Sequence, residues 1–269
     1  MKVRDQMNRE LECNARPKRI ISLVPSQTEF LYDLGLRAEL VGITKFCVHP
    51  DELYRSCERV GGTKQLDLEK IRYLQPDLII GNKEENTKEQ IAQLAEEFPV
   101  WLSDVNTVPD ALAMMRALAM LCDREKAGAE LLRASEEAMR SCQNIFKDLR
   151  VLYLMWHGPW MGVGSETFIH AMLKHLGFAN ALADQSRYPI LEESNFKALS
   201  ADFCFLSSEP FPFSEKHSTE LQHLHAGKPV FVDGEMFSWY GSRLIKAGPY
   251  FRELKEKLAS KERVAFSEI

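Results

Sequence analysis

The sequence predicts an α/β fold of two lobes, each with a mostly parallel sheet flanked by helices, joined by one long α-helix. Two segments carry this prediction, because each is an amphipathic helical stretch that runs into a short buried strand: residues 68–81 and 193–206. Their residues match at one constant offset of 125 positions: Ile71 with Phe196, Leu74 with Leu199, and Asp77 with Asp202. Between them, apolar residues three and four apart over 123–149, without proline, are typical of one long helix. We therefore predict three parts: an amino-terminal lobe over 17–122, a linking helix over 123–149 and a carboxyl-terminal lobe over 150–269.

Strands and helices alternate along the first lobe. Short apolar runs bounded by proline, glycine or polar residues predict buried parallel strands at 19–24, 40–44, 78–80 and 100–102. Helical spacing predicts helices at 27–34, from Leu68 to before Pro76, at 87–98 and at 108–121. Ser26 and Glu29 form a capping-box pattern at the start of the first helix, which Gly35 ends. Residues 60–63 are expected to form a loop.

The second lobe restarts the same alternation. Strands are predicted at 151–155, 203–206 and 230–232, and helices at 167–176 and 242–258. Gly248-Pro249 falls inside the last helix, where we expect a kink or a restart, because proline has no amide donor and clashes with the preceding turn. Strands and helices joined by short loops favour a mostly parallel sheet with helices on both faces.

The composition is that of a globular protein and excludes several functional classes. The net charge is −5 and no Lys/Arg-rich run is present, so nucleic-acid binding has no electrostatic basis. No apolar run approaches the roughly 18 residues of a membrane-spanning helix. The amino terminus has a positive start without the apolar core of a secretory signal, so nothing in the chain as written directs export. The six scattered cysteines are expected to be buried reduced thiols.

Several segments together resemble a known family. They are Arg19 to Gly35, Leu40 to Thr44, Val60 to Gly62, Leu68 to Ile71 and Gln75 to Ile80 in the first half, and Gly162 to Asn180 and Phe237 to Arg243 in the second. The chain resembles, over roughly residues 17–258, the cobalamin, iron-siderophore and haem substrate-binding proteins of ABC importers. In those proteins one backbone helix joins two α/β lobes. The motifs are mostly structural, so they indicate the family and leave the ligand open.

The resemblance implies that a ligand lies in the cleft between the lobes, on loops at the carboxyl ends of the strands. Carried over residue by residue, it implies these ligand contacts: Ser26, Gln27, His49, Lys64, Asn82, Trp156, His157, Trp160, Tyr188, Trp239, Tyr240 and Arg243. It implies a ligand that is cobalamin, haem or an iron chelate, no catalytic cofactor, no enzymatic activity and a monomer. Tryptophan and tyrosine suit such ligands, since they offer large flat surfaces with a polar edge.

Docking on an importer permease is implied by one acidic residue in each lobe. Glu69 matches the first position. The internal repeat places Ser194 at the second, which departs from the family pattern. Glu192 and Glu193 lie beside it as candidate substitutes, and Glu193 is the one we select. The resemblance therefore implies a periplasmic or cell-envelope location. Without an export signal, a full-length chain would be cytoplasmic.

Some residues admit a second interpretation. Cys47, His49 and His157 are candidate metal ligands, because imidazole and thiolate can bind iron, cobalt or zinc. Arg243 either pairs with an acidic group of the ligand or is a surface arginine. The histidines at 217, 223 and 225 lie among charged residues and indicate a solvated helix or loop. The alternative function is an intracellular metal- or corrinoid-binding protein, or an enzyme, that has this fold and no transporter.

Overall fold

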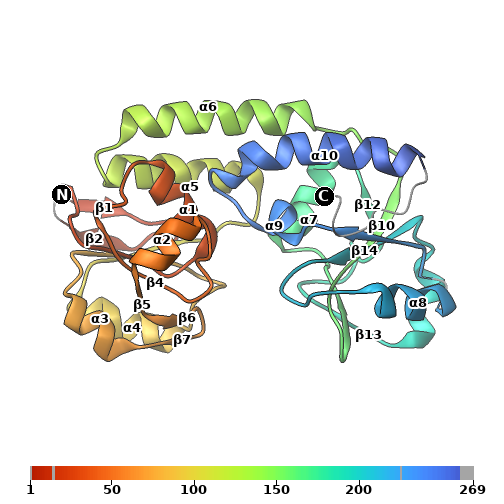
Figure 1. Ribbon diagram of the computed structural model, residues 1–269, viewed down its shortest axis with the longest axis horizontal. Coiled ribbons are helices and arrows are strands. Elements are labelled where there is room, and N and C mark those ends of the chain that lie inside the picture. The colour runs from red at the N-terminus through yellow and green to blue at the C-terminus, as the bar shows by residue number, and fades with distance from the viewer. Residues whose placement is uncertain (1, 14–15, 225, 261–269) are drawn as a thin grey trace. The chain divides into compact units, whose positions relative to one another are not determined.

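The computed structural model describes residues 2–13, 16–224 and 226–260, and the chain divides into two compact units. Unit 1 consists of Met1–Val105, Pro109–Glu136 and Trp239–Arg243, and unit 2 of Asn106–Val108, Glu137–Ser238 and Leu244–Ile269. Each unit has its own β-sheet with helices beside it (Figure 1). The α/β class predicted from the sequence is therefore confirmed.

The sheet of unit 1 has five parallel strands in the order β5-β4-β3-β8-β9. These are β3 (Ile20–Ser22), β4 (Leu40–Ile43), β5 (Glu58–Arg59), β8 (Leu78–Asn82) and β9 (Val100–Ser103). Every residue of β3, β8 and β9 is buried, as is usual in a parallel sheet covered on both faces. The four predicted strands are confirmed. The sequence did not predict β5, because its two exposed charged residues carry no apolar signal.

Five helices accompany this sheet: α1 (Pro25–Asp33), α2 (Asp51–Ser56), α3 (Leu68–Leu74), α4 (Lys88–Glu97) and α5 (Val108–Leu121). Figure 1 shows α3 and α4 together on one side of the sheet and α5 on the other. Ile71 of α3 and Leu94 of α4 pack with Ile21 and Ile79 of the strands in one buried cluster. The apolar face of each amphipathic helix therefore becomes the core of the unit.

The internal repeat seen in the sequence extends to hydrogen bonds. In unit 1 the carboxylate of Asp77 accepts from the Arg19 amide at 2.9 Å, and the Arg19 guanidinium donates to the Leu74 carbonyl at 2.9 Å. In unit 2, Asp202 accepts from the Arg150 amide at 2.7 Å. The Arg150 guanidinium donates to the carbonyl of Leu199 at 3.0 Å. In both copies an arginine at the start of a strand donates to a carbonyl at the end of a helical segment, where carbonyls have no partner within the helix. That segment precedes β8 in unit 1 and β14 in unit 2.

Two hairpins of unit 1 were not predicted. β1 (Lys2–Arg4) pairs antiparallel with β2 (Glu10–Glu12). The buried Asp5 carboxylate accepts from the amides of its own turn and from the Leu102 amide of β9, which attaches the hairpin to the sheet edge. The expected loop at 60–63 instead contains β6 (Gly61–Gly62), which pairs with β7 (Gln65–Leu66). A strand of two glycines has no alternation of apolar and polar residues, so the sequence does not predict it.

The sheet of unit 2 follows the order β13-β11-β10-β14-β15, with β12 also paired to β10. Its strands are β10 (Arg150–Trp156), β11 (Trp160–Gly162), β12 (Ala179–Asn180), β13 (Ile190–Leu191), β14 (Phe203–Ser207) and β15 (Lys228–Val232). β10, β12, β14 and β15 are parallel, whereas β11 and β13 are antiparallel additions. The mostly parallel sheet is confirmed, and the antiparallel edge was not predicted.

The helical elements of unit 2 are α7 (Phe168–Leu176), α8 (Glu215–His223), α9 (Gly234–Ser238), most of α10 (Arg243–Ser260) and the 3-10 segment η1 (Glu193–Leu199). η1 corresponds to α3 in the repeat, and its end matches as well. Gln75 after α3 and Ser200 after η1 both adopt the left-handed conformation, with φ of 45° and 46°. The helix predicted before β14 is therefore present, in a tighter 3-10 form.

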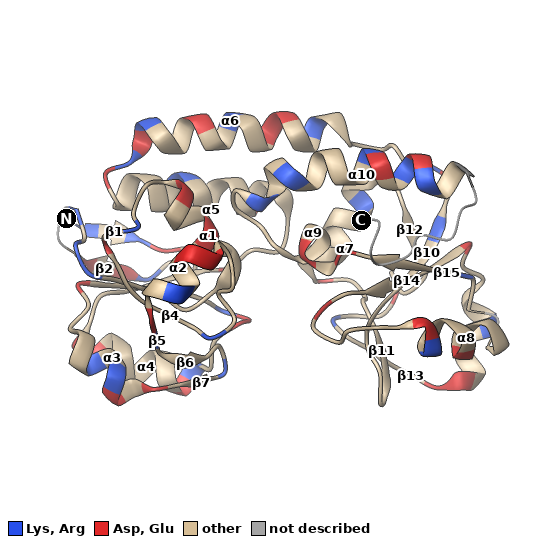
Figure 2. Cartoon of the chain, viewed as in Figure 1, with Lys and Arg blue, Asp and Glu red and all other residues tan. Residues whose placement is uncertain are grey.

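The linking helix predicted over 123–149 is shorter than expected. α6 spans Glu125–Ser141, and both charge signs alternate along it (Figure 2). Asn144 and Asp148 adopt positive φ, which ends helical geometry. The amide of Asn144 donates to the His175 carbonyl, and the Phe146 ring stacks on Phe178 at 4.2 Å. Packing on the end of α7 therefore replaces the last two turns of the predicted helix.

Two local predictions about helices can be compared with the structure. α10 is continuous through Gly248-Pro249, so the predicted restart is wrong. A Cβ at Gly248 would lie 2.7 Å from the Ala138 carbonyl oxygen, so glycine there allows α10 to approach α6 closely. The capping box of Ser26 and Glu29 is also absent. α1 begins at Pro25 after Val24, and Glu29 forms an ion pair instead.

All six cysteines are free and buried, as predicted. Across residues 2–13, 16–224 and 226–260 no helix is both long and apolar enough to cross a membrane.

Candidate ligand-binding site

In unit 1 the predicted residues after β3 and β8 are buried in one polar network. Gln27 donates to the Ser103 hydroxyl and lies 3.5 Å from the Tyr240 hydroxyl. Asn82 donates to the same Ser103 hydroxyl at 2.9 Å, and its side-chain oxygen accepts from the amides of Glu84 and Glu85. Burial raises the pKa of Tyr240. Ser26 on α1 is buried as well, so these polar side chains lie in the interior of unit 1 near the carboxyl ends of β3 and β8.

The loop after β4 has the exposed apolar residues of this edge. Phe46 is 50% exposed and Val48 is 41% exposed, while His49 is half-buried. The Lys45 ammonium lies 5.1 Å from the centre of the Phe46 ring. The sequence analysis selected His49 and Cys47 from this loop and missed Phe46. The sequence carried no signal for the exposure of Phe46, because apolar residues near the end of a strand usually continue the core.

Cys47 is turned inward from the same loop. Its sulfur lies 3.1 Å from the hydroxyls of both Thr28 and Thr44, and the residue has no exposed surface. Burial raises the pKa of the Cys47 thiol, although the two threonine hydroxyls oppose this effect. A neutral, enclosed thiol is a poor metal ligand, because coordination requires the thiolate. Among the described residues no group of three or more histidine, cysteine or acidic side chains could hold a metal ion.

Lys64 lies in the hairpin between β6 and β7 and is exposed. Its ammonium donates to the carbonyl of Glu84, and its own carbonyl accepts from the Thr87 hydroxyl. These bonds tie the hairpin to the loop after β8. Lys64 therefore lies beside the loop that follows β8, and its contact with a ligand stays a prediction.

Trp239, Tyr240 and Arg243 belong to unit 1, although the sequence analysis placed them in the second lobe. Arg243 forms an ion pair with Glu29 of α1 at 2.8 Å, and both side chains are only 5% exposed. Its guanidinium also lies 4.8 Å from the centre of the Trp239 ring. Trp239 meets the His49 ring edge-on, with centroids 5.5 Å apart. Arg243 therefore contributes to the interior of unit 1 and is not a surface arginine.

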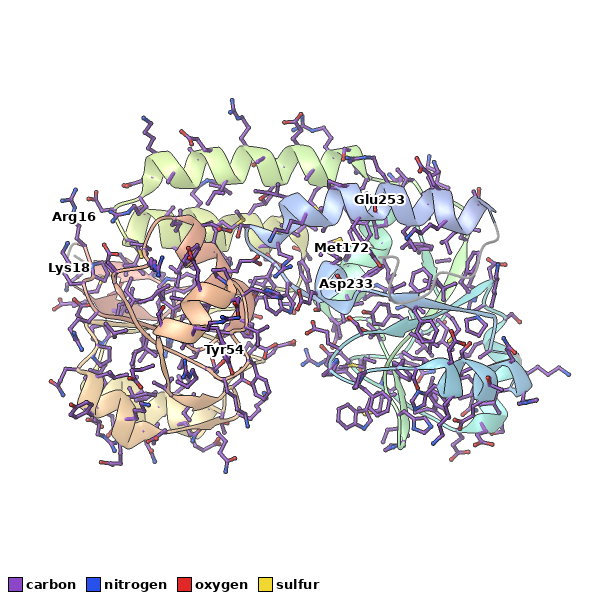
Figure 3. All side chains as sticks on the ribbon, viewed as in Figure 1. Arg16, Lys18, Tyr54, Met172, Asp233 and Glu253 are labelled. Atoms are coloured by element: carbon purple, nitrogen blue, oxygen red, sulfur yellow. The ribbon has the colours of Figure 1, made fainter. Side chains whose placement is uncertain are left out.

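In unit 2 the register of β11 against β10 and β13 places Trp156 and Trp160 on opposite faces of the sheet. Trp156 is opposite Met161, and Met161 is opposite Ile190. Residues directly opposite share a face. Trp156 is 39% exposed, Ile190 is 64% exposed and Met161 is half-buried. We call Trp156, Met161 and Ile190 the apolar row, and aromatic rings near β13 are visible in Figure 3.

Trp160 lies on the opposite face of the same hairpin. It is opposite Leu191 and is buried in the core of unit 2. Its ring meets Phe196 at 5.7 Å and is parallel to Phe213 at 6.1 Å. The structure therefore separates Trp156 and Trp160, which the sequence had grouped. Tyr188, close to Ile190 in the chain, is half-buried with the Arg187 guanidinium 5.6 Å from its ring.

His157 is part of a cluster of rings beside the apolar row. Its ring centroid lies 4.3 Å from that of Trp160, 4.9 Å from His217 and 5.8 Å from Phe211. Phe211 also contacts Trp156, at 5.6 Å. The His157 ring nitrogen lies 3.4 Å from the Glu220 carboxylate. The sequence analysis missed Phe211, and the solvated location expected for His217 was wrong, because His217 is 8% exposed.

His217 should make the stability of unit 2 depend on pH. Burial and the neighbouring His157 lower the pKa of His217 below its usual 6.5. The unfolded chain therefore takes up a proton first as the pH falls, and stability decreases below about pH 6.5. Burial also lowers the pKa of His170, which adds to the same trend. We therefore expect the urea midpoint of unfolding to be lower at pH 5 than at pH 7.5.

His217→Asn should reduce this pH dependence, since asparagine can accept from the Ser214 amide as the His217 ring does now. His223→Asn, on the exposed side of α8, is the matched control and should keep it. If the urea midpoint depends on pH as strongly in His217→Asn as in the wild type, this prediction is wrong.

Comparisons with known proteins agree on one family. The model of the family described as "Periplasmic binding protein" matches residues 20–230. An uncharacterized ABC transporter substrate-binding lipoprotein of Bacillus subtilis (strain 168) is 26% identical over 210 residues, or 74% of this chain and 66% of that protein. A vitamin B12-binding protein of Pectobacterium carotovorum subsp. carotovorum (strain PC1) is 35% identical over 106 residues, or 39% of this chain and 38% of that protein. The matched segments span less than two thirds of these relatives.

Solved structures show the same fold. A periplasmic vitamin B12-binding protein of Vibrio cholerae superposes with a TM-score of 0.75 at 21% identity, covering 91% of this chain and 99% of that chain. A periplasmic heme-binding protein in complex with two hemes gives 0.78 at 23% identity, covering 90% and 99%. A catecholate-siderophore-binding protein of Vibrio cholerae gives 0.76 at 14% identity, covering 95% and 99%.

Proposed function

Because this chain belongs to the periplasmic binding protein family, we propose that it is a substrate-binding protein for a corrinoid, haem or iron-chelate ligand of an ABC importer. The names of its relatives support this ligand class, since they bind vitamin B12, heme or a siderophore. The relatives named are binding proteins, and the proposal assigns no catalytic residue. The relatives described as periplasmic or as a lipoprotein support a cell-envelope location.

The observation that carries the proposal is the exposed apolar row of unit 2. Trp156, Met161 and Ile190 expose adjacent apolar side chains at the carboxyl end of β10. In open α/β sheets ligands bind at this end of the strands. A corrin, a porphyrin or a catecholate presents a flat apolar face, and covering such a row contributes roughly 25 cal/mol per Å² of apolar surface. We propose that the ligand lies on this row, with His157 and Tyr188 at its border.

In unit 1 we propose direct contacts for the residues that reach the surface of the carboxyl edge: Phe46, Val48, His49 and Lys64. The buried residues Ser26, Gln27, Asn82, Tyr240 and Arg243 would support them from below, and Trp239 would support His49. Trp160 would have the same supporting role in unit 2. This division follows from burial, because the supporting residues are at most 7% exposed and have little surface to offer a ligand.

A binding panel tests the proposal. The purified protein is titrated with cyanocobalamin, ferric protoporphyrin IX and a ferric catecholate, followed by calorimetry and tryptophan fluorescence. We expect one of the three to bind with a dissociation constant of about 1 μM or below, equivalent to roughly 8 kcal/mol. Failure of all three ligands to bind would contradict the proposed function. A strong preference for one would identify the ligand, which the relatives leave open.

Docking on the importer is proposed for the two acidic residues on the corresponding helical segments. Glu69 of α3 has 87% of its side chain exposed, although it pairs with Arg72, and Glu193 of η1 is exposed. We expect Glu69→Lys and Glu193→Lys each to lower ligand-stimulated ATP hydrolysis by the partner importer in liposomes about tenfold, since an unpaired or reversed charge at a docking contact costs 1–2 kcal/mol or more.

Glu96→Lys is the control for this measurement, because Glu96 is an exposed acidic residue of α4 outside the repeat. Ligand affinity should be unchanged in all three variants. If Glu69→Lys and Glu193→Lys stimulate ATP hydrolysis as much as the wild-type protein does, these two residues are not docking contacts. The ligand-binding proposal would be unaffected.

A further inference from the structure

The segment Trp239–Arg243 returns to unit 1 from the far end of the sequence and is held there by several anchors. The Ser242 hydroxyl donates to the Asp33 carboxylate of α1. The Tyr240 hydroxyl lies 3.5 Å from the Gln27 amide. Gly241 has φ of +89° and lies so close to α1 that an added Cβ would be 3.1 Å from that of Phe30. These three contacts fix the segment on α1 without involving any charge on Arg243.

The segment Trp239–Arg243 therefore has contacts that hold it on α1 in addition to the ion pair between Glu29 and Arg243. Both side chains are 5% exposed, so the pair has lost most of its hydration. Buried ion pairs gain little net stability over an apolar replacement, because desolvation opposes the attraction. What the pair does supply is a fixed direction for the guanidinium plane, because the carboxylate holds the Arg243 Nε at 2.8 Å.

A continuous series of contacts leads from this pair to the surface. The guanidinium held by Glu29 lies 4.8 Å from the centre of the Trp239 ring. The Trp239 ring meets His49 edge-on at 5.5 Å and an interplanar angle of 69°. His49 is the only one of these four residues that is more than 9% exposed, and it lies on the loop that also exposes Phe46 and Val48.

We infer that Glu29 and Arg243 are positioning residues, which orient Trp239 and through it hold His49 at the ligand-contacting edge of unit 1. The role of His49 rests on the proposed function, whereas the orientation of its ring does not. Cation–π attraction is strongest when the cation is desolvated, as it is here, so Arg243 should restrict the Trp239 ring to one orientation. The ion pair thus acts on ligand binding through two intervening rings, without touching the ligand.

The experiment compares Glu29→Gln, Arg243→Lys and the control Arg124→Lys. Arg243→Lys keeps a positive charge next to Glu29 and should fold, but it lacks the planar fork that stacks on Trp239. Arg124→Lys changes the ion pair between Arg124 and Glu39, at 3.1 Å, which lies in the same unit and outside the segment Trp239–Arg243. The first measurement is the ring-current-shifted imidazole resonance of His49 in the ligand-free protein. The second is affinity for the tightest-binding probe among cyanocobalamin, ferric protoporphyrin IX and a ferric catecholate.

Glu29→Gln and Arg243→Lys should both move the His49 resonance and weaken binding by about tenfold, while Arg124→Lys leaves both unchanged. An unmoved His49 resonance in Arg243→Lys would overturn the inference, whether or not Glu29→Gln folds. A moved resonance with unchanged affinity would overturn the effect on binding. If no probe binds the wild type, the ligand-binding function fails, and the resonance alone still decides whether the pair orients the rings.

Discussion

Trp156→Ala should weaken ligand binding by about 30-fold, corresponding to roughly 2 kcal/mol, the usual scale for a central tryptophan of a binding surface. Trp156 is the largest member of the apolar row and is 39% exposed, so it has surface to give to a ligand. Its ring is held by Phe211 at 5.6 Å, which limits the entropy lost on binding. Calorimetric titration with the tightest probe of the panel measures the effect.

Two further variants separate binding from folding. Tyr73→Ala removes an exposed aromatic residue of α3, 85% exposed, that lies outside the strand ends and should leave affinity unchanged. Trp160→Ala opens a void in the core of unit 2 and should lower stability by about 3–5 kcal/mol. Unchanged affinity in Trp156→Ala, in a protein as stable as the wild type, would remove the apolar row from the binding site.

The different burial of Trp156 and Trp160 could not be predicted from the sequence. The repeat of 125 residues located α3, β8, η1 and β14 because their apolar patterns are local. The carbonyls of Leu74 and Leu199 follow the repeat, and their donors Arg19 and Arg150 lie outside it. The two tryptophans differ in burial because β10 turns back through three residues and pairs with β11 in a shifted register. Strand register is set by non-local pairing, and no pattern within 156–160 specifies it.

The Glu29–Arg243 pair illustrates the same limit at longer range. Its residues are 214 positions apart, and each has an adequate local explanation, a helix cap for Glu29 and a surface position for Arg243. Only the return of the segment Trp239–Arg243 to α1 brings them together. Phe46 was missed for a different reason. Apolar residues after a strand usually continue the core, and its 50% exposure becomes visible only once the loop turns it outward.

Gly164→Ala should be the most destabilising single-methyl change near the candidate site. A Cβ at position 164 would lie 2.0 Å from the backbone oxygen of Gln185 and 2.8 Å from its carbonyl carbon. Backbone cannot rotate away as a side chain can, and this backbone is fixed, because the amides of Gly164 and Ser165 donate to the carbonyls of Arg187 and Gln185. The added methyl must separate the two segments, at a cost of roughly 3 kcal/mol.

Gly162→Ala is the matched control, two residues away in the same chain segment. There the added Cβ would meet chiefly the terminal methyl of Leu182, which can change rotamer, so we expect a smaller loss of about 1 kcal/mol. Urea unfolding followed by circular dichroism measures both. The segment displaced by Gly164→Ala leads directly into Tyr188 and Ile190, so ligand affinity should fall together with stability in this variant. Equal stability of Gly162→Ala and Gly164→Ala would contradict the close backbone approach on which this part of the site is built.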